Sequence, residues 1–154
     1  MTARRSAFCE QEKRIHSKSF DELGNGAEEP RTQGPLVLII DDDPDVADAT
    51  AMLLDVMGYR TLVAADATGA REQLARSKDA PKAIICDLHL SRGCNGVDAL
   101  REVRAAANRT IPAILVTGDT TSSTAGLLQD VEACHLLSKP ADTDELLRLL
   151  RSFL

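Results

Sequence analysis

The sequence predicts an α/β fold in which a five-stranded parallel sheet is covered by helices on both faces. From residue 36 onward, short apolar runs alternate five times with segments of helical character, as expected for repeated strand–helix units. The apolar runs are continuous rather than alternating with polar residues, which is typical of parallel strands that are buried on both faces. The 154-residue length suits one domain preceded by a tail.

Residues 1–35 differ in composition from the remainder of the chain. They contain as many basic as acidic residues and end in GNGAEEPRTQGP, so we interpret them as a flexible tail and linker, with the folded domain at residues 36–154. The net charge of −6 therefore belongs to the domain. An acidic domain is a poor nucleic-acid binder, because phosphate binding requires a basic face.

No apolar stretch has the length needed to cross a membrane, and the N-terminus lacks the apolar core of a signal peptide. We therefore expect no membrane association and a cytoplasmic location. The four cysteines, Cys9, Cys86, Cys94 and Cys134, show no metal-ligand spacing. Cys86 and Cys134 lie in apolar runs and are expected to pack in the core.

The first predicted strand is LVLII (residues 36–40), and a helix is expected over residues 44–58. Asp43 can cap this helix, Pro44 suits its first turn and Gly58 can end it. Four apolar residues recur at helical spacing within it: Val46, Ala49, Leu53 and Met57.

The later elements repeat this order, in which each strand precedes a helix. Strands are predicted at YRTLVAA (59–65), KAIIC (82–86), PAILV (112–116) and CHLLS (134–138), and helices at 67–78, 97–107, 120–132 and 142–154. Gly126 weakens the helix at 120–132. Asp142 and Glu145 form a capping pair at the start of the last helix.

Polar residues directly follow four of the five predicted strands. They are Asp41, Asp42 and Asp43, then Asp87, then Thr117, then Lys139 after Ser138. Each has an ordinary structural explanation as a helix cap, a turn residue or a solvated cation. Because ligands of open α/β sheets bind at the carboxyl ends of the strands, we expect the set to converge on one rim.

The residue types at this rim indicate a cation and a phosphoryl group. The first turn contains no glycine and is strongly anionic, so it would repel a bare phosphate. Clustered carboxylates favour Mg²⁺, which binds one or two carboxylates together with phosphate oxygens. Lys139 and the Thr117 hydroxyl would share the phosphoryl charge, and Asp87 would be the carboxylate nucleophile that forms an aspartyl phosphate.

Five motifs occur in order: LVLIIDDDP, MGYRTLVAADATGA, IICDLHL, ILVTGD and LLSKP. With them, residues 36–154 resemble a response regulator receiver domain of two-component signalling. The resemblance implies a flavodoxin-like (βα)5 receiver fold, and a module that is phosphorylated on itself rather than an enzyme with a separate substrate. It also implies a histidine kinase or histidine phosphotransfer protein as partner.

The resemblance assigns a role to each residue of the rim. Asp87 matches the phosphoacceptor, Thr117 the switch hydroxyl and Lys139 the phosphate-binding lysine. Asp42 matches the direct Mg²⁺ ligand, and Asp41 matches the acidic residue that acts through water. The backbone carbonyl of His89 would complete the metal ligands, Asp43 would cap the helix, and the Lys139-Pro140 bond would be cis.

Two features depart from the family pattern. Gly96 lies nine residues after Asp87 instead of eight, and the loop lacks the usual proline, as in receivers of hybrid sensor histidine kinases. Leu136 occupies the position of the usual aromatic switch residue, so the response to phosphorylation must differ from the usual one. The resemblance also suggests a homodimer through the face formed by the fourth helix, the fifth strand and the fifth helix.

Two alternatives belong to other functional classes. Asp41-x-Asp43 formally matches the acid pair of a haloacid-dehalogenase-like phosphatase, but Asp45 follows where Thr or Val is usual, and the chain leaves little room for a substrate cap. The second alternative is a receiver-like binding module with vestigial chemistry. We expect either a stand-alone receiver or a receiver from a larger kinase, because no effector domain follows residue 154.

Overall fold

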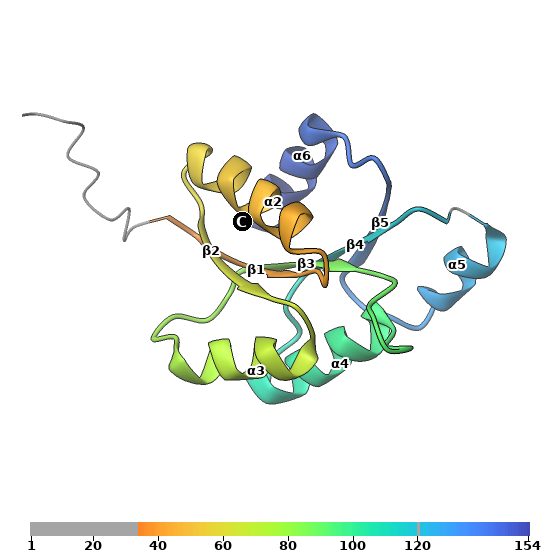
Figure 1. Ribbon diagram of the computed structural model, residues 1–154, viewed down its shortest axis with the longest axis horizontal. Coiled ribbons are helices and arrows are strands. Elements are labelled where there is room, and N and C mark those ends of the chain that lie inside the picture. The colour runs from red at the N-terminus through yellow and green to blue at the C-terminus, as the bar shows by residue number, and fades with distance from the viewer. Residues whose placement is uncertain (1–33, 120) are drawn as a thin grey trace, which may run out of the picture. The chain divides into compact units, whose positions relative to one another are not determined.

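The computed structural model describes residues 34–119 and 121–154 (Figure 1). The predicted tail lies outside these residues except for Gly34 and Pro35, and the boundary between tail and domain stays a prediction. Both residues already bond to the domain: the Gly34 carbonyl accepts from Arg60 Nε at 2.9 Å, and the Pro35 carbonyl accepts from the Arg60 backbone N–H at 3.0 Å. Within the described part of the chain, no helix is long and apolar enough to cross a membrane.

Five parallel strands form one sheet in the order β2-β1-β3-β4-β5. The strands are β1 (Leu36–Ile40), β2 (Arg60–Ala64), β3 (Ala83–Asp87), β4 (Ala113–Thr117) and β5 (Cys134–Ser138). This confirms the predicted (βα)5 fold. The strand order reverses between β1 and β3, which is the position at which open α/β sheets bind ligands.

Only the three central strands are buried on both faces. Every residue of β1, β3 and β4 is buried, whereas β2 and β5 contain one buried residue each. The expectation that all five strands are doubly buried is therefore wrong for β2 and β5. These two strands lie at the sheet edges, where the flanking helices cover them incompletely.

Helices cover the two faces of the sheet (Figure 1). Helices α2 (Pro44–Val56) and α6 (Thr143–Phe153) lie on one face, and α3 (Ala67–Arg76) and α4 (Gly96–Ala107) on the other. Side chains alternate along β1 accordingly: Val37 and Ile39 pack with α2 and α6, and Leu38 and Ile40 pack with α3 and α4. The sheet thus separates two apolar clusters and fixes the ends of its strands rigidly.

Helix α2 begins at Pro44 as predicted and ends at Val56, two residues before the predicted end at Gly58, but it buries a different side. The Asp43 carboxylate accepts from the backbone N–H groups of Asp45 and Val46, and Gly58 has φ 92° just beyond the helix. The fully buried residues are Ala47 and Leu54, while Val46 and Met57 of the predicted stripe are 40% and 41% exposed. The rotation of α2 on the sheet therefore leaves an apolar strip at the surface.

Helix α5 (Ser122–Leu127) is shorter than predicted. The sequence predicts helix over 120–132, but the chain turns after Leu128 and reaches β5 through Ala133, which has φ 48°. Gly126 weakens this segment because glycine loses the most backbone entropy in a helix. Of the predicted Asp142/Glu145 capping pair, Asp142 caps α6 by accepting from the Asp144 N–H. Asp66 caps α3 in the same way by accepting from the Gly69 N–H.

The cysteines within the described residues are free thiols. Cys86 is fully buried in β3, which confirms its predicted place in the core, whereas Cys134 is only partly buried. Burial raises the pKa of the Cys86 thiol far above its usual value, and the charges of Asp87 and Asp41 raise it further. Cys86 is therefore a packing residue rather than a nucleophile, and Cys9 lies outside the described residues.

Candidate functional site

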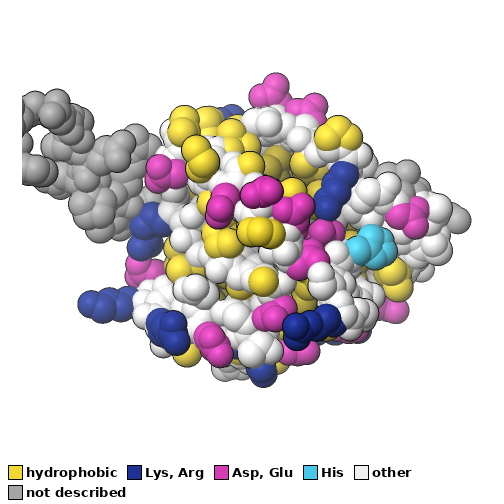
Figure 2. All heavy atoms as spheres, viewed as in Figure 1, with side chains coloured by type: hydrophobic (Ala, Val, Ile, Leu, Met, Phe, Trp, Pro, Cys, Tyr) yellow, Lys and Arg dark blue, Asp and Glu magenta, His cyan; other side chains and the backbone are white. Residues whose placement is uncertain are grey.

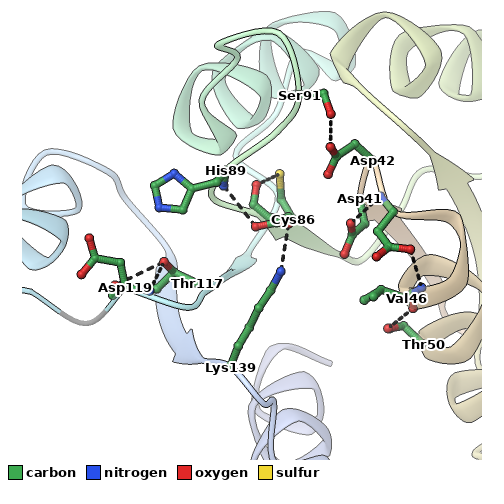
Figure 3. Close-up of polar contacts among 12 residues, drawn as sticks. Asp41, Asp42, Val46, Thr50, Cys86, His89, Ser91, Thr117, Asp119 and Lys139 are labelled. Carbon is green, nitrogen blue, oxygen red and sulfur yellow. Dashed lines mark hydrogen bonds and ion pairs between the residues drawn. The ribbon is translucent and has the colours of Figure 1, made fainter.

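Three aspartates meet at the carboxyl edge of the sheet, and Figure 3 labels two of them, Asp41 and Asp42. Asp41 and Asp42 follow β1, and Asp87 is the last residue of the neighbouring strand β3. One carboxylate oxygen from each lies within 4.8 Å of the others. The structure thus brings together side chains that are 45 residues apart in the chain, at the position where the strand order reverses.

Asp87 is buried and held by two neighbours. Its Oδ2 accepts from Lys139 Nζ at 3.0 Å, and its Oδ1 accepts from the His89 backbone N–H at 3.1 Å. Lys139 follows β5, and its own N–H donates to the Thr117 carbonyl at 2.7 Å. The Lys139-Pro140 bond is cis, as predicted. Backbone contacts from three strands therefore fix the Asp87–Lys139 pair.

The pKa values of the site show that negative charge is crowded there. Burial raises the pKa of Asp41, and the charges of Asp87 and Asp42 raise it further, against lowering by the Asp43 N–H and by Lys139. Burial alone would lower the pKa of Lys139, but its hydrogen bond to Asp87 and the charges of the three aspartates raise it. Lys139 is therefore a permanent cation, and one ammonium faces three carboxylates.

The donor set fits Mg²⁺. Three convergent carboxylates supply the hard oxygen ligands that this ion prefers, and the uncompensated negative charge favours a divalent cation. Asp41, Asp42 and Asp87 are the residues that would hold it. The carbonyl of His89 stays a predicted ligand, and the exposed imidazole of His89 points away from Asp41 and Asp42 (Figure 3).

Thr117 lies beside the aspartates without contacting them. It ends β4, next to β3, and is fully buried. Its hydroxyl donates to the Asp119 carbonyl at 3.2 Å and accepts from the Asp119 N–H at 3.0 Å. To donate to a phosphoryl group on Asp87, the Thr117 hydroxyl would have to give up its hydrogen bond to the Asp119 carbonyl.

Asp43 is outside the cluster, as predicted. Its Oδ1 accepts from the backbone N–H groups of Asp45 at 3.0 Å and Val46 at 3.4 Å, so the carboxylate is occupied with capping α2. The phosphatase alternative needs Asp43 as an acid beside Asp41. The capping geometry does not favour that role.

Two residues that contact the site, Ser91 and Asp119, were not predicted from the sequence. The Ser91 hydroxyl donates to Asp42 Oδ2 (Figure 3), and the backbone of Asp119 holds the Thr117 hydroxyl. The extra residue in the loop after Asp87 was the available signal for Ser91, because a longer loop can reach back over the site. Asp119 acts through its backbone, which residue type alone cannot reveal.

A cavity of about 560 Å³ adjoins the aspartates. Asp41, Asp87 and Lys139 line it, and most other lining residues are apolar. They come from the strands, from the first two turns of α2, from the loop before α6 and from α6 itself: Ile39, Ile40, Ile85, Val116, Val46, Thr50, Pro140, Ala141 and Leu146. In Figure 2 acidic side chains gather in the middle of this face, with hydrophobic side chains among them.

Curated relatives share the domain. The family model for the response regulator receiver domain matches residues 37–151. The transcriptional regulatory protein KdpE of Mycobacterium tuberculosis is 35% identical over 117 residues, which are 76% of this chain and 50% of that protein. The sensor kinase/phosphatase CqsS of Vibrio cholerae is 28% identical over 113 residues, 72% of this chain and 16% of that protein. The chain thus spans half or less of these two relatives.

Solved structures share the fold. A response regulator receiver protein from Pseudomonas putida matches with a TM-score of 0.69 and 29% identity, covering 77% of this chain and 97% of that one. The receiver domain of a sensor histidine kinase from Pseudomonas aeruginosa PAO1, with a magnesium ion in its active site cleft, matches with a TM-score of 0.64 and 28% identity, covering 78% and 97%. The family model, the strand order and the aspartate cluster agree, and the chain belongs to the response regulator receiver domain family.

Proposed function

We propose that Asp87 accepts a phosphoryl group from the phosphohistidine of a histidine kinase or histidine phosphotransfer protein. One observation carries this proposal: Asp87 is a buried carboxylate that is paired with Lys139 and clustered with Asp41 and Asp42 beside an open cleft. A buried carboxylate fixed in this way can act as a nucleophile. Family membership supports the same role.

Asp87 and Lys139 have different roles in the proposed transfer. A carboxylate oxygen of Asp87 bonds to phosphorus while the P–N bond of the donor breaks, and the electron pair of that bond leaves with the imidazole nitrogen. The Lys139 ammonium, 3.0 Å from Oδ2, faces the incoming phosphoryl oxygens and offsets their charge. The product is an acyl phosphate on Asp87, so the module is modified rather than turning over a separate substrate.

Mg²⁺ is the proposed cofactor, held by Asp41, Asp42, Asp87 and the His89 carbonyl. Bound there, it would neutralise the aspartates and the oxygens of the phosphoryl group. The magnesium ion of the Pseudomonas aeruginosa receiver domain supports this assignment.

Phosphorylation of the wild-type chain by acetyl phosphate tests the function directly. With Mg²⁺ we expect one phosphoryl group per chain by intact mass, located on Asp87 by peptide mapping. With EDTA in place of Mg²⁺ we expect the initial rate to fall at least about tenfold, because the charge of the aspartates then opposes the donor. Incorporation at the full rate in EDTA, or on another residue, would overturn the proposal, and no incorporation would favour the vestigial alternative.

We further propose that the Thr117 hydroxyl carries the conformational response. It can donate to the phosphoryl group only by giving up its hydrogen bond to the Asp119 carbonyl. The Asp119 carboxylate in turn accepts from the Thr121 N–H at the start of α5. Phosphorylation would therefore loosen the turn between β4 and α5 and shift a two-state equilibrium. Leu136, a partly buried residue of β5, cannot report this movement with an aromatic ring.

The outer face of α2 is the proposed docking surface for the phosphohistidine donor. Its apolar side chains Val46, Met52, Val56 and Met57 are 40%, 70%, 75% and 41% exposed, and Val46 also lines the cavity above Asp87. A donor that places its phosphohistidine over Asp87 must cover this cleft. The exposed apolar strip of α2 begins at Val46, which lines the cavity, and supplies contact area beside it.

A paired variant tests the docking surface. Met52→Gln combined with Val56→Gln removes apolar surface without adding charge. We expect transfer from a phosphotransfer protein that phosphorylates the wild type to slow at least about tenfold, with no change in the rate from acetyl phosphate. Leu127→Gln is the matched control, since Leu127 on α5 is 48% exposed. Equal slowing by the control, or no slowing by the pair, would contradict the proposal.

A homodimer through α5, β5 and α6 stays a proposal, supported by the edge position of β5 and by exposed Leu127. The cytoplasmic location and the lack of a nucleic-acid partner also stay proposals, supported by the acidic composition. Attachment to a larger kinase or regulator is a further proposal, supported by relatives such as CqsS that are longer than this chain.

A further inference from the structure

The loop between β3 and α4 folds into a tight hairpin. His89 and Asn95 form an isolated antiparallel bridge, and the Leu90 N–H donates to the Cys94 carbonyl at 3.2 Å. At the tip, Arg92 and Gly93 have φ values of 64° and 71°, the sign that both central residues of a type I′ turn require. The extra residue of this loop is therefore absorbed into a defined turn.

The hairpin is anchored to Asp87 at both ends. On one side the His89 N–H donates to Asp87 Oδ1 at 3.1 Å. On the other side the Gly96 N–H donates to the Leu88 carbonyl at 2.7 Å, and Gly96 packs so closely that a Cβ there would lie 2.3 Å from the Asp87 carbonyl oxygen. Residues carried by the hairpin consequently have a fixed position relative to Asp87.

Ser91 lies on this hairpin, and its side chain reaches across the site to Asp42 in the turn after β1. Its hydroxyl donates to Asp42 Oδ2, linking the loop after β3 to the turn after β1 over 49 residues of sequence (Figure 3). Within residues 34–119 and 121–154, it is the one hydrogen-bond donor to the Asp42 carboxylate. Asp41 differs, because its Oδ1 is already held by the Asp43 N–H at 2.9 Å.

We propose that Ser91 is a positioning residue that orients the Asp42 carboxylate and so raises the affinity of the aspartate cluster for Mg²⁺. The inference rests on the proposed role of Asp42 as a ligand. A carboxylate on a partly exposed turn rotates freely, and holding Oδ2 fixes the direction of Oδ1. Hydrogen bonds that orient metal ligands commonly raise metal affinity, because fewer conformations are lost on binding.

Mg²⁺ titration by calorimetry tests this, with affinity rather than phosphorylation as the readout. For Ser91→Ala we expect the Kd for Mg²⁺ to rise about three- to tenfold, the size expected of one partly exposed hydrogen bond. Ser91→Thr, which keeps the hydroxyl, should restore an affinity near that of the wild type. Cys94→Ala is the matched control, because it changes an exposed side chain of the same hairpin without touching Asp42.

A double-mutant cycle separates positioning from a merely structural role. If Ser91 acts through Asp42, then Ser91→Ala should change the Kd little in an Asp42→Asn background. An unchanged or tighter Kd for Ser91→Ala, or equal weakening in both backgrounds, would overturn the inference. If the wild type binds Mg²⁺ and the binding depends on Asp42, such a result refutes the role of Ser91 and leaves the proposed Mg²⁺ site standing. If the wild type binds no Mg²⁺, the proposed cofactor fails as well.

Discussion

Asp87→Asn is expected to reduce phosphoryl incorporation from acetyl phosphate by at least about a hundredfold, because an amide oxygen is a far weaker nucleophile than a carboxylate. The substitution nearly preserves the shape of the side chain, because an amide group replaces a carboxylate of similar size. The amide oxygen can still accept from the His89 N–H, as Oδ1 does at 3.1 Å, but the amide NH₂ group would face Lys139 instead of a carboxylate oxygen. The measurement is the initial rate by intact mass at saturating Mg²⁺.

Asp43→Asn is the matched control for this variant. Asp43 belongs to the same run of three aspartates but caps α2 instead of joining the cluster, and asparagine caps helices as well as aspartate does. We expect it to be phosphorylated at the wild-type rate. Wild-type incorporation in Asp87→Asn would exclude Asp87 as the acceptor. A large loss of phosphorylation in Asp43→Asn would mean that Asp43 takes part in the site and is not only a helix cap.

Gly96→Ala is expected to lower the free energy of unfolding by about 1–3 kcal/mol, the usual cost of forcing extra volume into a packed site. A Cβ at this position would lie 2.3 Å from the Asp87 carbonyl oxygen and 2.8 Å from Leu88 Cα. Both are backbone atoms, so no flexible side chain can move aside. The strand end that carries Asp87 must shift, and we expect slower phosphorylation together with lower stability.

Gly118→Ala provides the comparison, measured by the same urea denaturation. Gly118 follows the neighbouring strand β4, and a Cβ there would meet no atom within 4 Å. We expect a change within about 0.5 kcal/mol. If the two alanine variants were equally stable, the close approach at Gly96 would not be a constraint on this loop.

Asp87→Asn and Gly96→Ala test different parts of the same site. Asp87 is the proposed phosphoryl acceptor, and Gly96 allows the loop after β3 to turn immediately behind it. That loop then holds the Asp87 carboxylate through the His89 N–H and places Ser91 against Asp42. The site consequently depends on the path of the loop as well as on its charged residues.

Much of the fold and of the site follows from local sequence. The apolar runs predict the strands because a central parallel strand is buried on both faces, and Asp43, Pro44 and Gly58 mark the ends of α2 through cap and turn preferences that need no tertiary partner. The convergence of Asp41, Asp42, Asp87 and Lys139 is also predictable. The carboxyl ends of parallel strands share one edge of the sheet, whatever the side chains are.

Other features depend on how the elements pack. Helical spacing predicts α2 but not which side it buries, because that side is set by the rotation of the helix on the sheet. Ala47 and Leu54 are therefore buried while Val46 and Met57 are exposed. The edge strands β2 and β5 have apolar sequences, yet their burial depends on the helices above them.

The sequence by itself determined which residues reach the rim of the sheet, because strands that alternate with helices run parallel and their carboxyl ends share one edge. Only the tertiary structure decided which of them touch. Asp87 contacts Lys139 and His89, Thr117 bonds to Asp119, and Asp42 bonds to Ser91. These contacts depend on side-chain rotation and loop path over a few ångströms, and nearest neighbours in sequence do not fix either.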